Sequence, residues 1–201
     1  MKILVVGGAG TIGRHVVAKF TTSHEVLVAG RNTGDVTVDL TDAASIEAMF
    51  AQTGPLGAIV CIAGDAKWAP FNELAEEDYY IGFRSKLMGQ VNLVRLGQAH
   101  LNPGGSFTLS TGILADDPVV MTASAAMVNG AIHSFVKAAS LEMENGHRLN
   151  VVSSGLVEDS VEKYADYFPG HNPIPMPKAV NAYVRSIMGK ANGEIFRVYD
   201  H

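Results

Sequence analysis

The sequence holds a single cysteine, Cys61, in 201 residues. One cysteine cannot form an internal disulfide, which is typical of proteins in a reducing compartment. Cys61 lies within an apolar run, so we interpret it as a buried, unreactive thiol rather than a nucleophile. We therefore expect no disulfide framework and a cytoplasmic location.

Positive charge and long apolar runs are also scarce. Fifteen Lys and Arg stand against twenty Asp and Glu, for a net charge of −5, so no basic surface for nucleic acid is expected. The apolar runs are far shorter than the roughly 20 residues of a membrane helix. Met1-Lys2 leads directly into an apolar strand, unlike a signal peptide. We expect neither nucleic acid nor membrane as a partner.

Recognisable metal ligands and nucleophilic triads are lacking as well. The seven histidines are not spaced with cysteines or carboxylates as metal ligands are, and no Ser-His-Asp arrangement can be argued. The composition, 47% hydrophobic and 17% charged, is that of a globular protein. We expect one domain over residues 1–201, with a sizeable core and no metal.

The segment Lys2–Gly13, KILVVGGAGTIG, carries the strongest signal. An apolar run rich in β-branched residues predicts a buried strand, and its glycines fit both G-x-G-x-x-G and G-x-x-G-x-x-G. Apolar residues then recur at helical spacing, at Ile12, Val16, Val17 and Phe20. Strand, glycine turn and helix together predict a dinucleotide site with a pyrophosphate at the helix N-terminus. The alternative is a glycine-rich turn that binds nothing.

The rest of the chain alternates strands and helices. Further strands are expected at 25–29, 36–38, 57–62, 106–110, 148–152 and 194–199, and helices at 43–52, 73–80, 82–100, 123–144 and 178–188. A turn is expected at 102–105 and a proline-rich loop at 169–177. This alternation predicts an α/β fold, a doubly wound parallel sheet in a three-layer Rossmann-type sandwich. Ligands are then expected at the carboxyl ends of the strands.

The second strand ends at Arg31 and Asn32. In nucleotide-binding folds an acidic side chain at this place usually holds the ribose hydroxyls of NAD. An arginine fork suits a 2′-phosphate instead, so we predict NADP(H) as the cofactor. Asp35 could contact the ribose, and a solvated surface arginine is the simpler interpretation of Arg31.

Taken in order, these motifs resemble the short-chain dehydrogenase/reductase family over nearly the whole chain. Asp39-Leu40 is similar to the adenine-contacting pair of the family, and Ala63-Gly64 to the end of its Asn-Asn-Ala-Gly motif. Ser140-Leu141-Glu142 fits the end of its long helix. The segment Arg148–Gly155 is similar to the strand and loop placed over the nicotinamide, with Ser154 where proline is usual.

The resemblance implies a set of cofactor-binding residues: Gly7, Gly10, Thr11, Ile12, Gly13, Arg31, Asn32, Asp39, Leu40, Ala63, Gly64, Ser153 and Leu156. It implies hydride transfer to a small-molecule carbonyl substrate. It also implies that subunits pair through the helices at 82–100 and 123–144, giving a homodimer or homotetramer.

The family's catalytic Asn, Ser, Tyr and Lys are all replaced. Counting back from Glu142 puts Ala125 at the tyrosine position and Asn129 at the lysine position. The serine position falls on Gly112 and the asparagine position on Lys86. No tyrosine occurs between Tyr80 and Tyr164, so a shift of register does not restore the motif.

Another acid could replace the missing tyrosine, because a general acid contributes about 10²–10⁴ in rate while positioning contributes separately. Lys86 is our candidate proton donor; a surface or phosphate-pairing lysine is the alternative. Ser110 and Thr111 could polarise the carbonyl, and Asn129 could bind ribose. We interpret His133 as a helix-face or interface residue.

Tyr164, Tyr167 and Phe168 precede the proline-rich segment and predict an apolar lid over the nicotinamide, with stiff surface packing as the alternative. The sequence thus favours an NADP(H)-dependent carbonyl reductase with a non-standard active site. The other hypotheses are a non-catalytic NADP(H)-binding sensor or interaction protein, and a structural domain without nucleotide.

Overall fold

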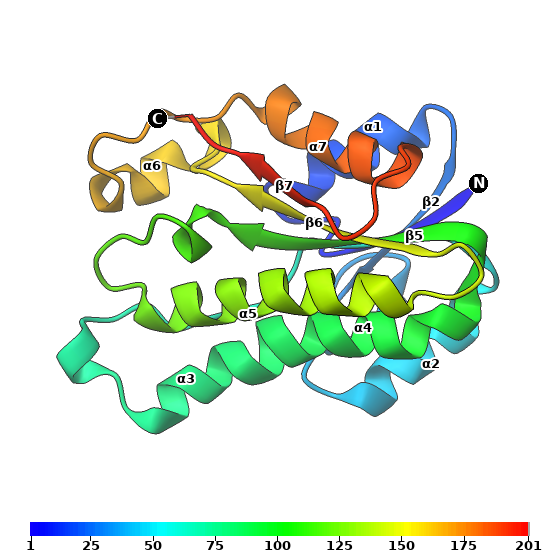
Figure 1. The fold of residues 1–201 in the computed structure, drawn as a ribbon, viewed down its shortest axis with the longest axis horizontal. Helices are drawn as coiled ribbons and strands as arrows, with labels where there is room; N and C mark the ends of the chain where they lie inside the picture. The colour runs from blue at the N-terminus through cyan, green and yellow to red at the C-terminus, as the bar shows by residue number, and fades with distance from the viewer. Residues whose placement is uncertain (201) are drawn as a thin grey trace.

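The computed structural model describes residues 1–200, which form a parallel sheet between two layers of helices (Figure 1). The strand order is β3-β2-β1-β4-β5-β6-β7, and every neighbouring pair is parallel. The strands of this part of the chain are Lys2–Val6 (β1), Glu25–Gly30 (β2), Val36–Thr37 (β3), Leu56–Cys61 (β4), Leu101–Gly112 (β5), Arg148–Ser154 (β6) and Ile195–Val198 (β7). The prediction of a doubly wound parallel sheet is confirmed.

Helices cover both faces of the sheet, as Figure 1 shows. One face carries Gly13–Thr21 (α1) and Met176–Met188 (α7); the other carries Ala43–Thr53 (α2), Glu76–Gly82 (α3), Gly89–Gly97 (α4) and Ala123–Ala139 (α5). The short helix Val161–Tyr164 (α6) lies near the carboxyl ends of the strands. Among residues 1–200, no helix has the length and apolar character needed to cross a bilayer.

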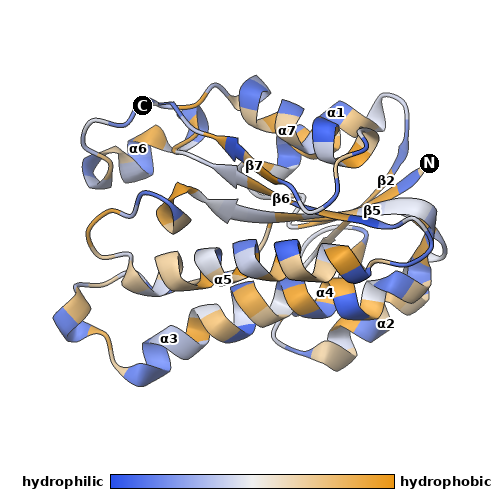
Figure 2. Ribbon diagram, in the orientation of Figure 1, coloured by the Kyte–Doolittle hydropathy of each residue, from blue (hydrophilic) through white to orange (hydrophobic). Residues whose placement is uncertain are grey.

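Each face of the sheet has its own hydrophobic core. In β1, Leu4 packs toward α2, α4 and α5, whereas Ile3 packs toward α1 and α7; both are fully buried. This two-sided burial explains the continuous apolar run of β1, since a parallel strand covered on both faces has no polar side. Figure 2 shows hydrophilic and hydrophobic residues alternating along α1 and α7, as expected for helices with one face on the sheet.

The predicted turn at 102–105 is wrong, because these residues belong to β5. The pairing with β4 shifts there: Leu56 pairs with Leu101, but Ala58 pairs with Ser106. The extra residues form an irregular bulge in which Gly104 has a φ of 77°. Its N–H donates to the carbonyl oxygen of Asn145 at 2.9 Å. The bulge thus keeps the strand continuous where Pro-Gly-Gly would usually end it.

The two long predicted helices are also divided. Residues 82–100 form the end of α3, a wide π-helical turn over Phe83–Met88, α4, and a final 3₁₀ turn. The helix predicted at 123–144 ends as α5 at Ala139 and continues as a single 3₁₀ turn, Ser140–Glu142. The helix predicted at 73–80 begins later, at Glu76. The wide turn matters most, because it carries Ser85 and Lys86.

The proline-rich loop is less open than predicted, because Ile174 bridges back to Val157. The N–H of Ile174 donates to Leu156 at 2.7 Å, and the N–H of Glu158 donates to Ile174 at 3.0 Å. The intervening segment, residues 158–173, is therefore closed at its base. It contains α6 and is called the aromatic segment below.

Candidate active site at the carboxyl ends of the strands

The glycine turn after β1 requires residues without side chains. Gly7 has a φ of 83°, and a Cβ there would lie 2.5 Å from the carbonyl oxygen of Ile62. A Cβ at Gly13 would collide with the carbonyl oxygen of Gly7. Within residues 1–200, the N–H groups of Thr11 and Ile12 have no backbone carbonyl partner. The turn therefore offers free donors at the start of α1, as a pyrophosphate site must.

A groove of about 570 Å³ runs from this turn across the carboxyl ends of β1, β2 and β4. The predicted residues Gly7, Gly10, Thr11, Arg31, Leu40, Ala63 and Gly64 line it. Thr33 and Asp65 line it too, and neither was predicted from the sequence. The free N–H groups, the absence of side chains in the turn and the volume fit a nicotinamide dinucleotide.

Other predicted cofactor residues lie beside the groove or beneath it. Ile12 and Leu156 line a neighbouring apolar pocket of about 170 Å³. Gly13 packs under the turn, and Asn32 is exposed while Thr33 takes its place on the groove wall. Asp39 accepts hydrogen bonds from Thr41 N and Oγ1 at 2.9 and 2.8 Å. The backbone hydrogen bond lowers the pKa of Asp39.

The side chain of Ser153, which the family resemblance assigns to the cofactor, is engaged within the protein. Its side chain is buried, and its Oγ lies 2.7 Å from the hydroxyl of Tyr199. Tyr199 in turn donates to Asp116 at 2.7 Å, and the Arg197 guanidinium donates to both oxygens of the same carboxylate. This network joins β6 and β7 to the turn after β5. The next residue, Ser154, lines the apolar pocket in place of Ser153.

Arg31 lines the groove with its side chain 58% exposed. Its Nη2 lies 3.6 Å from Oδ2 of Asp65, which follows β4. The guanidinium is thus held beside the groove by a weak, solvent-exposed ion pair. A phosphate group in the groove would compete with Asp65 for the same donors. Asp35, the alternative ribose contact, does not line the groove, and its Oδ2 accepts from Val28 N at 2.8 Å.

An inner pocket of about 210 Å³ lies beyond the groove. The four positions aligned with the family's Asn, Ser, Tyr and Lys all line it: Lys86, Gly112, Ala125 and Asn129. They come from the wide turn after α3, the end of β5 and the first turns of α5. Their convergence supports the alignment made from Glu142, and Ala125 leaves open the space that a tyrosine ring would fill.

Lys86 reaches this pocket because Gly64 makes room for it. Gly64 has a φ of 123°, and a Cβ there would lie 2.7 Å from Cα of Lys86. The wide turn is held in place by Ser85, whose Oγ accepts from Asp65 N at 3.0 Å. Burial lowers the pKa of Lys86. A lysine whose pKa is lowered exchanges protons more readily near neutral pH, as a proton donor must.

The hydroxyl groups of Thr111 and Ser110, both predicted to polarise the carbonyl, have different hydrogen-bond partners. Thr111 lines the inner pocket, and its Oγ1 lies 2.8 Å from Nε2 of His133 on α5. This partnership corrects the interpretation of His133, which is buried and faces the sheet; burial lowers its pKa. Ser110 points to the other face, donating to the Cys61 carbonyl at 2.6 Å and lying 2.9 Å from the Tyr183 hydroxyl. Ser110 is therefore a structural residue, not a catalytic one.

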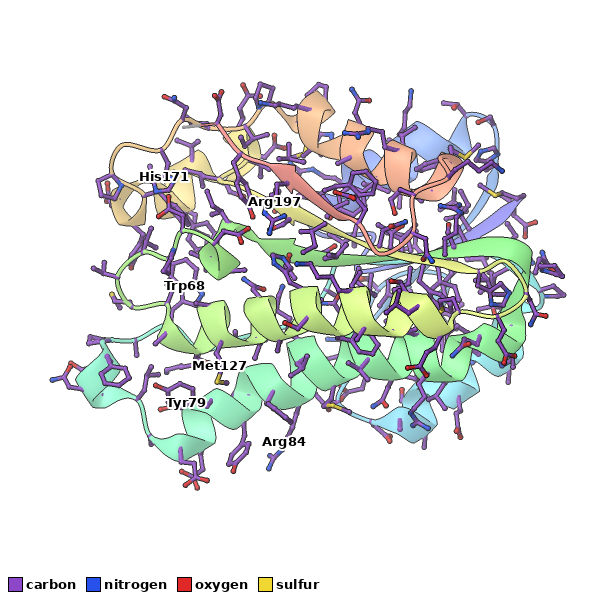
Figure 3. All side chains as sticks on the ribbon, viewed as in Figure 1. Trp68, Tyr79, Arg84, Met127, His171 and Arg197 are labelled. Carbon is purple, nitrogen blue, oxygen red and sulfur yellow. The ribbon has the colours of Figure 1, made fainter. Side chains whose placement is uncertain are left out.

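The single tryptophan, Trp68, lines both the inner and the apolar pocket, and no sequence motif indicated it. Its ring centroid lies 5.5 Å from that of Tyr164 and 5.6 Å from that of Tyr167. Figure 3 shows Trp68 beyond the start of α5, on the side of the aromatic segment. Tyr164 also lines the cofactor groove. The aromatic segment therefore borders the cofactor groove and the apolar pocket, and it contacts the inner pocket only through Trp68.

The sequence matches the model of a family described as enoyl-(acyl carrier protein) reductase over residues 10–174. Together with the fold and the glycine turn, this match places the chain in the short-chain dehydrogenase/reductase family. Members of this family are oxidoreductases that bind a nicotinamide cofactor.

Solved structures share the fold over nearly the whole chain. The protein lin1944 from Listeria innocua is 46% identical, with a TM-score of 0.97 over 99% of this chain and 100% of its own. A small-chain dehydrogenase in complex with NADPH is 24% identical, with a TM-score of 0.87 over 99% of this chain and 96% of its own. No curated protein sequence matches the chain.

Among residues 1–200, no group of three or more His, Cys, Asp or Glu could hold a metal ion.

Proposed function

We propose that this protein is an NADP(H)-dependent reductase of a small carbonyl compound, with Lys86 in place of the usual tyrosine as proton donor. The observation that carries the proposal is the convergence of Lys86 and Asn129 on one pocket beside the cofactor groove. Bound NADPH supplies the hydride, so the chain itself must position the carbonyl and provide one proton. We also propose a cytoplasmic, single-domain protein over residues 1–201.

Arg31 supports NADP(H) over NAD(H). The groove has a guanidinium rather than a carboxylate at the end of β2, and a guanidinium binds a 2′-phosphate with two parallel hydrogen bonds. A structurally similar dehydrogenase was solved with NADPH. Thr11 and Ile12 would hold the pyrophosphate through backbone N–H groups, and Gly7 and Gly10 would let it approach the backbone closely.

The residues of the inner pocket then have distinct roles. The Lys86 ammonium donates a hydrogen bond to the carbonyl oxygen and transfers a proton to it as the carbon is reduced. Asn129 provides an amide for a ribose hydroxyl or a polar group of the substrate. The aromatic segment with Trp68 excludes water from the reacting atoms, which strengthens these polar contacts.

The test is NADPH oxidation by purified protein with a panel of aldehydes, ketones and imines. Turnover should be lost in Gly13→Asp, whose side chain would collide with the glycine turn, and should fall about 10²–10⁴-fold in Lys86→Met. Lys67→Met is the matched control, because Lys67 is exposed and lies outside the inner pocket. Full turnover in Lys86→Met with intact NADPH binding would remove Lys86 as the proton donor.

The second candidate is a non-catalytic NADP(H)-binding sensor or interaction protein. Ala125 at the tyrosine position is the observation in its favour, because the usual proton donor is replaced by an inert methyl group. Tight NADPH binding without turnover of any carbonyl in the panel would favour this function.

A further inference from the structure

The inner pocket has one basic side chain on its wall and no acidic side chain to balance it. Besides Lys86, its walls consist of glycines, apolar side chains, Thr111 and Asn129, with no acidic side chain among them. Among residues 1–200, no carboxylate forms an ion pair with Lys86. When Lys86 is protonated, the pocket therefore carries a positive charge and no negative one.

Asp65 is the carboxylate whose charge acts on Lys86, but it cannot neutralise the pocket. It contributes to the cofactor groove rather than the inner pocket, its side chain is 70% exposed, and it pairs with Arg31. Cys61 also acts on Lys86, but burial raises the pKa of its thiol to about 11, so it stays neutral. An ammonium partly removed from water without a contacting anion is costly. A ligand carboxylate would remove that cost.

A second polar group faces the same space. Asn129 is 3% exposed, and its Oδ1 has no hydrogen-bond partner within residues 1–200. Buried amide oxygens are rarely left unpaired in native structures, but this oxygen is closed to solvent, so the Nδ2 side of the amide, which lies toward Gly112, is the part that can meet a ligand in the pocket. Thr111 contributes little further, because its hydroxyl is engaged with His133. Lys86 and Asn129 are thus the two groups available to a ligand.

The rest of the cavity wall is apolar. Leu114 and Trp68 line both the inner pocket and the adjoining apolar pocket of about 170 Å³. Phe168 and Leu156 extend this apolar wall away from Lys86. A ligand that fills both cavities would have an anionic end and an apolar body.

We propose that the substrate is a 2-oxo acid with an apolar side chain, whose carboxylate binds the Lys86 ammonium. This rests on the proposed function. In a 2-oxo acid a carboxylate oxygen and the carbonyl oxygen lie side by side, and an ammonium has three N–H donors. One Lys86 ammonium can therefore contact both oxygens.

The hydride, the electron pairs and the proton of this reaction can all be accounted for. The carbonyl carbon gains the hydride and forms a C–H bond, and NADPH is oxidised to NADP⁺. The C=O π-electron pair forms an O–H bond with a proton from Lys86, which regains one from solvent. The product is a 2-hydroxy acid, still held by its carboxylate.

Trp68 provides a test that does not depend on turnover. It is the only tryptophan of the chain, so its fluorescence reports directly on the two pockets. We would titrate protein saturated with NADP⁺, which has no hydride to give, with 4-methyl-2-oxopentanoate and with its methyl ester. We expect saturable quenching by the acid and at least about tenfold weaker binding of the ester. Equal affinity, or no saturable signal with the acid, would overturn the proposal without the need for any variant.

Two variants test whether the preference for the acid over the ester depends on Lys86. Lys86→Met should bind the acid at least about tenfold more weakly and should weaken ester binding much less, because the ester has only the carbonyl contact to lose; Lys67→Met should behave as wild type. Unchanged acid binding in a folded Lys86→Met protein would also overturn the proposal. NADPH oxidation separates this outcome from the proposed function. Reduction of neutral ketones but not of the acid would leave the reductase standing without the anion site. Tight binding of the acid without its reduction would support the anion site and contradict the proposed reductase activity.

Discussion

Arg31 and Asp65 show how much of the cofactor site depends on single side chains. Both line the groove, and the 3.6 Å ion pair between them must break before the Arg31 guanidinium can bind a phosphate. Under the proposed function, cofactor choice then depends on a competition between the Asp65 carboxylate and the 2′-phosphate for Arg31. Arg31 could be predicted from its position after the second strand. Asp65 could not, because only the fold brings the end of β4 beside the end of β2.

Replacing Arg31 should separate the two cofactors. A charge-assisted hydrogen bond contributes about 1.5–3 kcal/mol, so Arg31→Ala should weaken NADPH binding about 10- to 100-fold. NADH lacks the 2′-phosphate and should bind as before. Calorimetric titration of both cofactors would measure the difference. An equal loss for both would contradict the assignment of Arg31 to the phosphate.

Replacing Asp65 should have the opposite effect. Asp65→Asn releases Arg31 and removes a negative charge from the groove, so NADPH should bind more tightly. Exposed ion pairs are typically worth up to about 1 kcal/mol, which limits the gain to roughly fivefold. Glu47→Gln is a charge-matched control on α2, since Glu47 is exposed and outside the groove. Weaker binding in Asp65→Asn would show that Asp65 itself contacts the cofactor.

Asp116 should make stability depend on acid pH. Hydrogen bonding from Arg197 lowers its pKa, so the folded state favours the charged form. This contribution is fully present above the unfolded pKa of about 3.9 and is lost as the pH falls through the lower folded value. Asp116→Asn should therefore lower the melting temperature at neutral pH, and its deficit should shrink steadily below about pH 4. A deficit that does not change with pH would contradict this origin.

At the scale of elements, α4 packs unusually close to the sheet. Gly97 ends the helix, and a Cβ there would lie 2.9 Å from side-chain atoms of both Phe107 and Phe50. The helix can approach β4 and β5 this closely only without a side chain. The strands and helices themselves could be predicted from apolar periodicity. Neither the wide turn at Phe83–Met88 nor the bulge in β5 could be, because each depends on tertiary packing rather than on local composition.

Two glycine-to-alanine changes test this packing with opposite expected signs. Gly97→Ala forces a methyl group into a filled space and should destabilise the protein by about 1–3 kcal/mol. At Gly130 on α5 a Cβ would meet no atom within 4 Å, so Gly130→Ala should stabilise it by up to about 1 kcal/mol. Urea unfolding would measure both. Destabilisation by both changes would show that the space beside Gly130 is occupied by a partner subunit.

At the scale of the whole molecule, large apolar side chains remain exposed on one side. Ile81, Phe83 and Met127 are each 42–45% exposed on α3, the following turn and α5. Figure 3 shows Met127 of α5 beside Tyr79 of α3 on this side of the molecule. These elements belong to the two predicted pairing helices, although the structure divides both. We propose that this surface joins subunits into a homodimer or homotetramer.

Light scattering at micromolar protein should therefore give a mass at least twice that of the 21.3 kDa chain. Charged groups at the core of an interface are strongly unfavourable, so Ile81→Asp with Met127→Asp should reduce the mass to that of a smaller species. Met188→Asp is the control, because Met188 is also exposed, 51%, but lies at the end of α7. A wild-type monomer would contradict the proposed pairing.

The bridge between Val157 and Ile174 has a consequence for how this molecule can change over time. It closes the aromatic segment at its base, and the segment is tied to the surrounding fold by further contacts such as the ion pairs of Asp159 with Arg14 and His15 on α1. Substitutions or insertions between these two residues alter the walls around the substrate while the sheet, the glycine turn and the inner pocket keep their positions. In effect, the segment can vary as one unit. Under the proposed function, substitutions within the sixteen residues 158–173 would change substrate preference, provided that the contacts of Asp159 with α1 and of Tyr164 with the cofactor groove are kept.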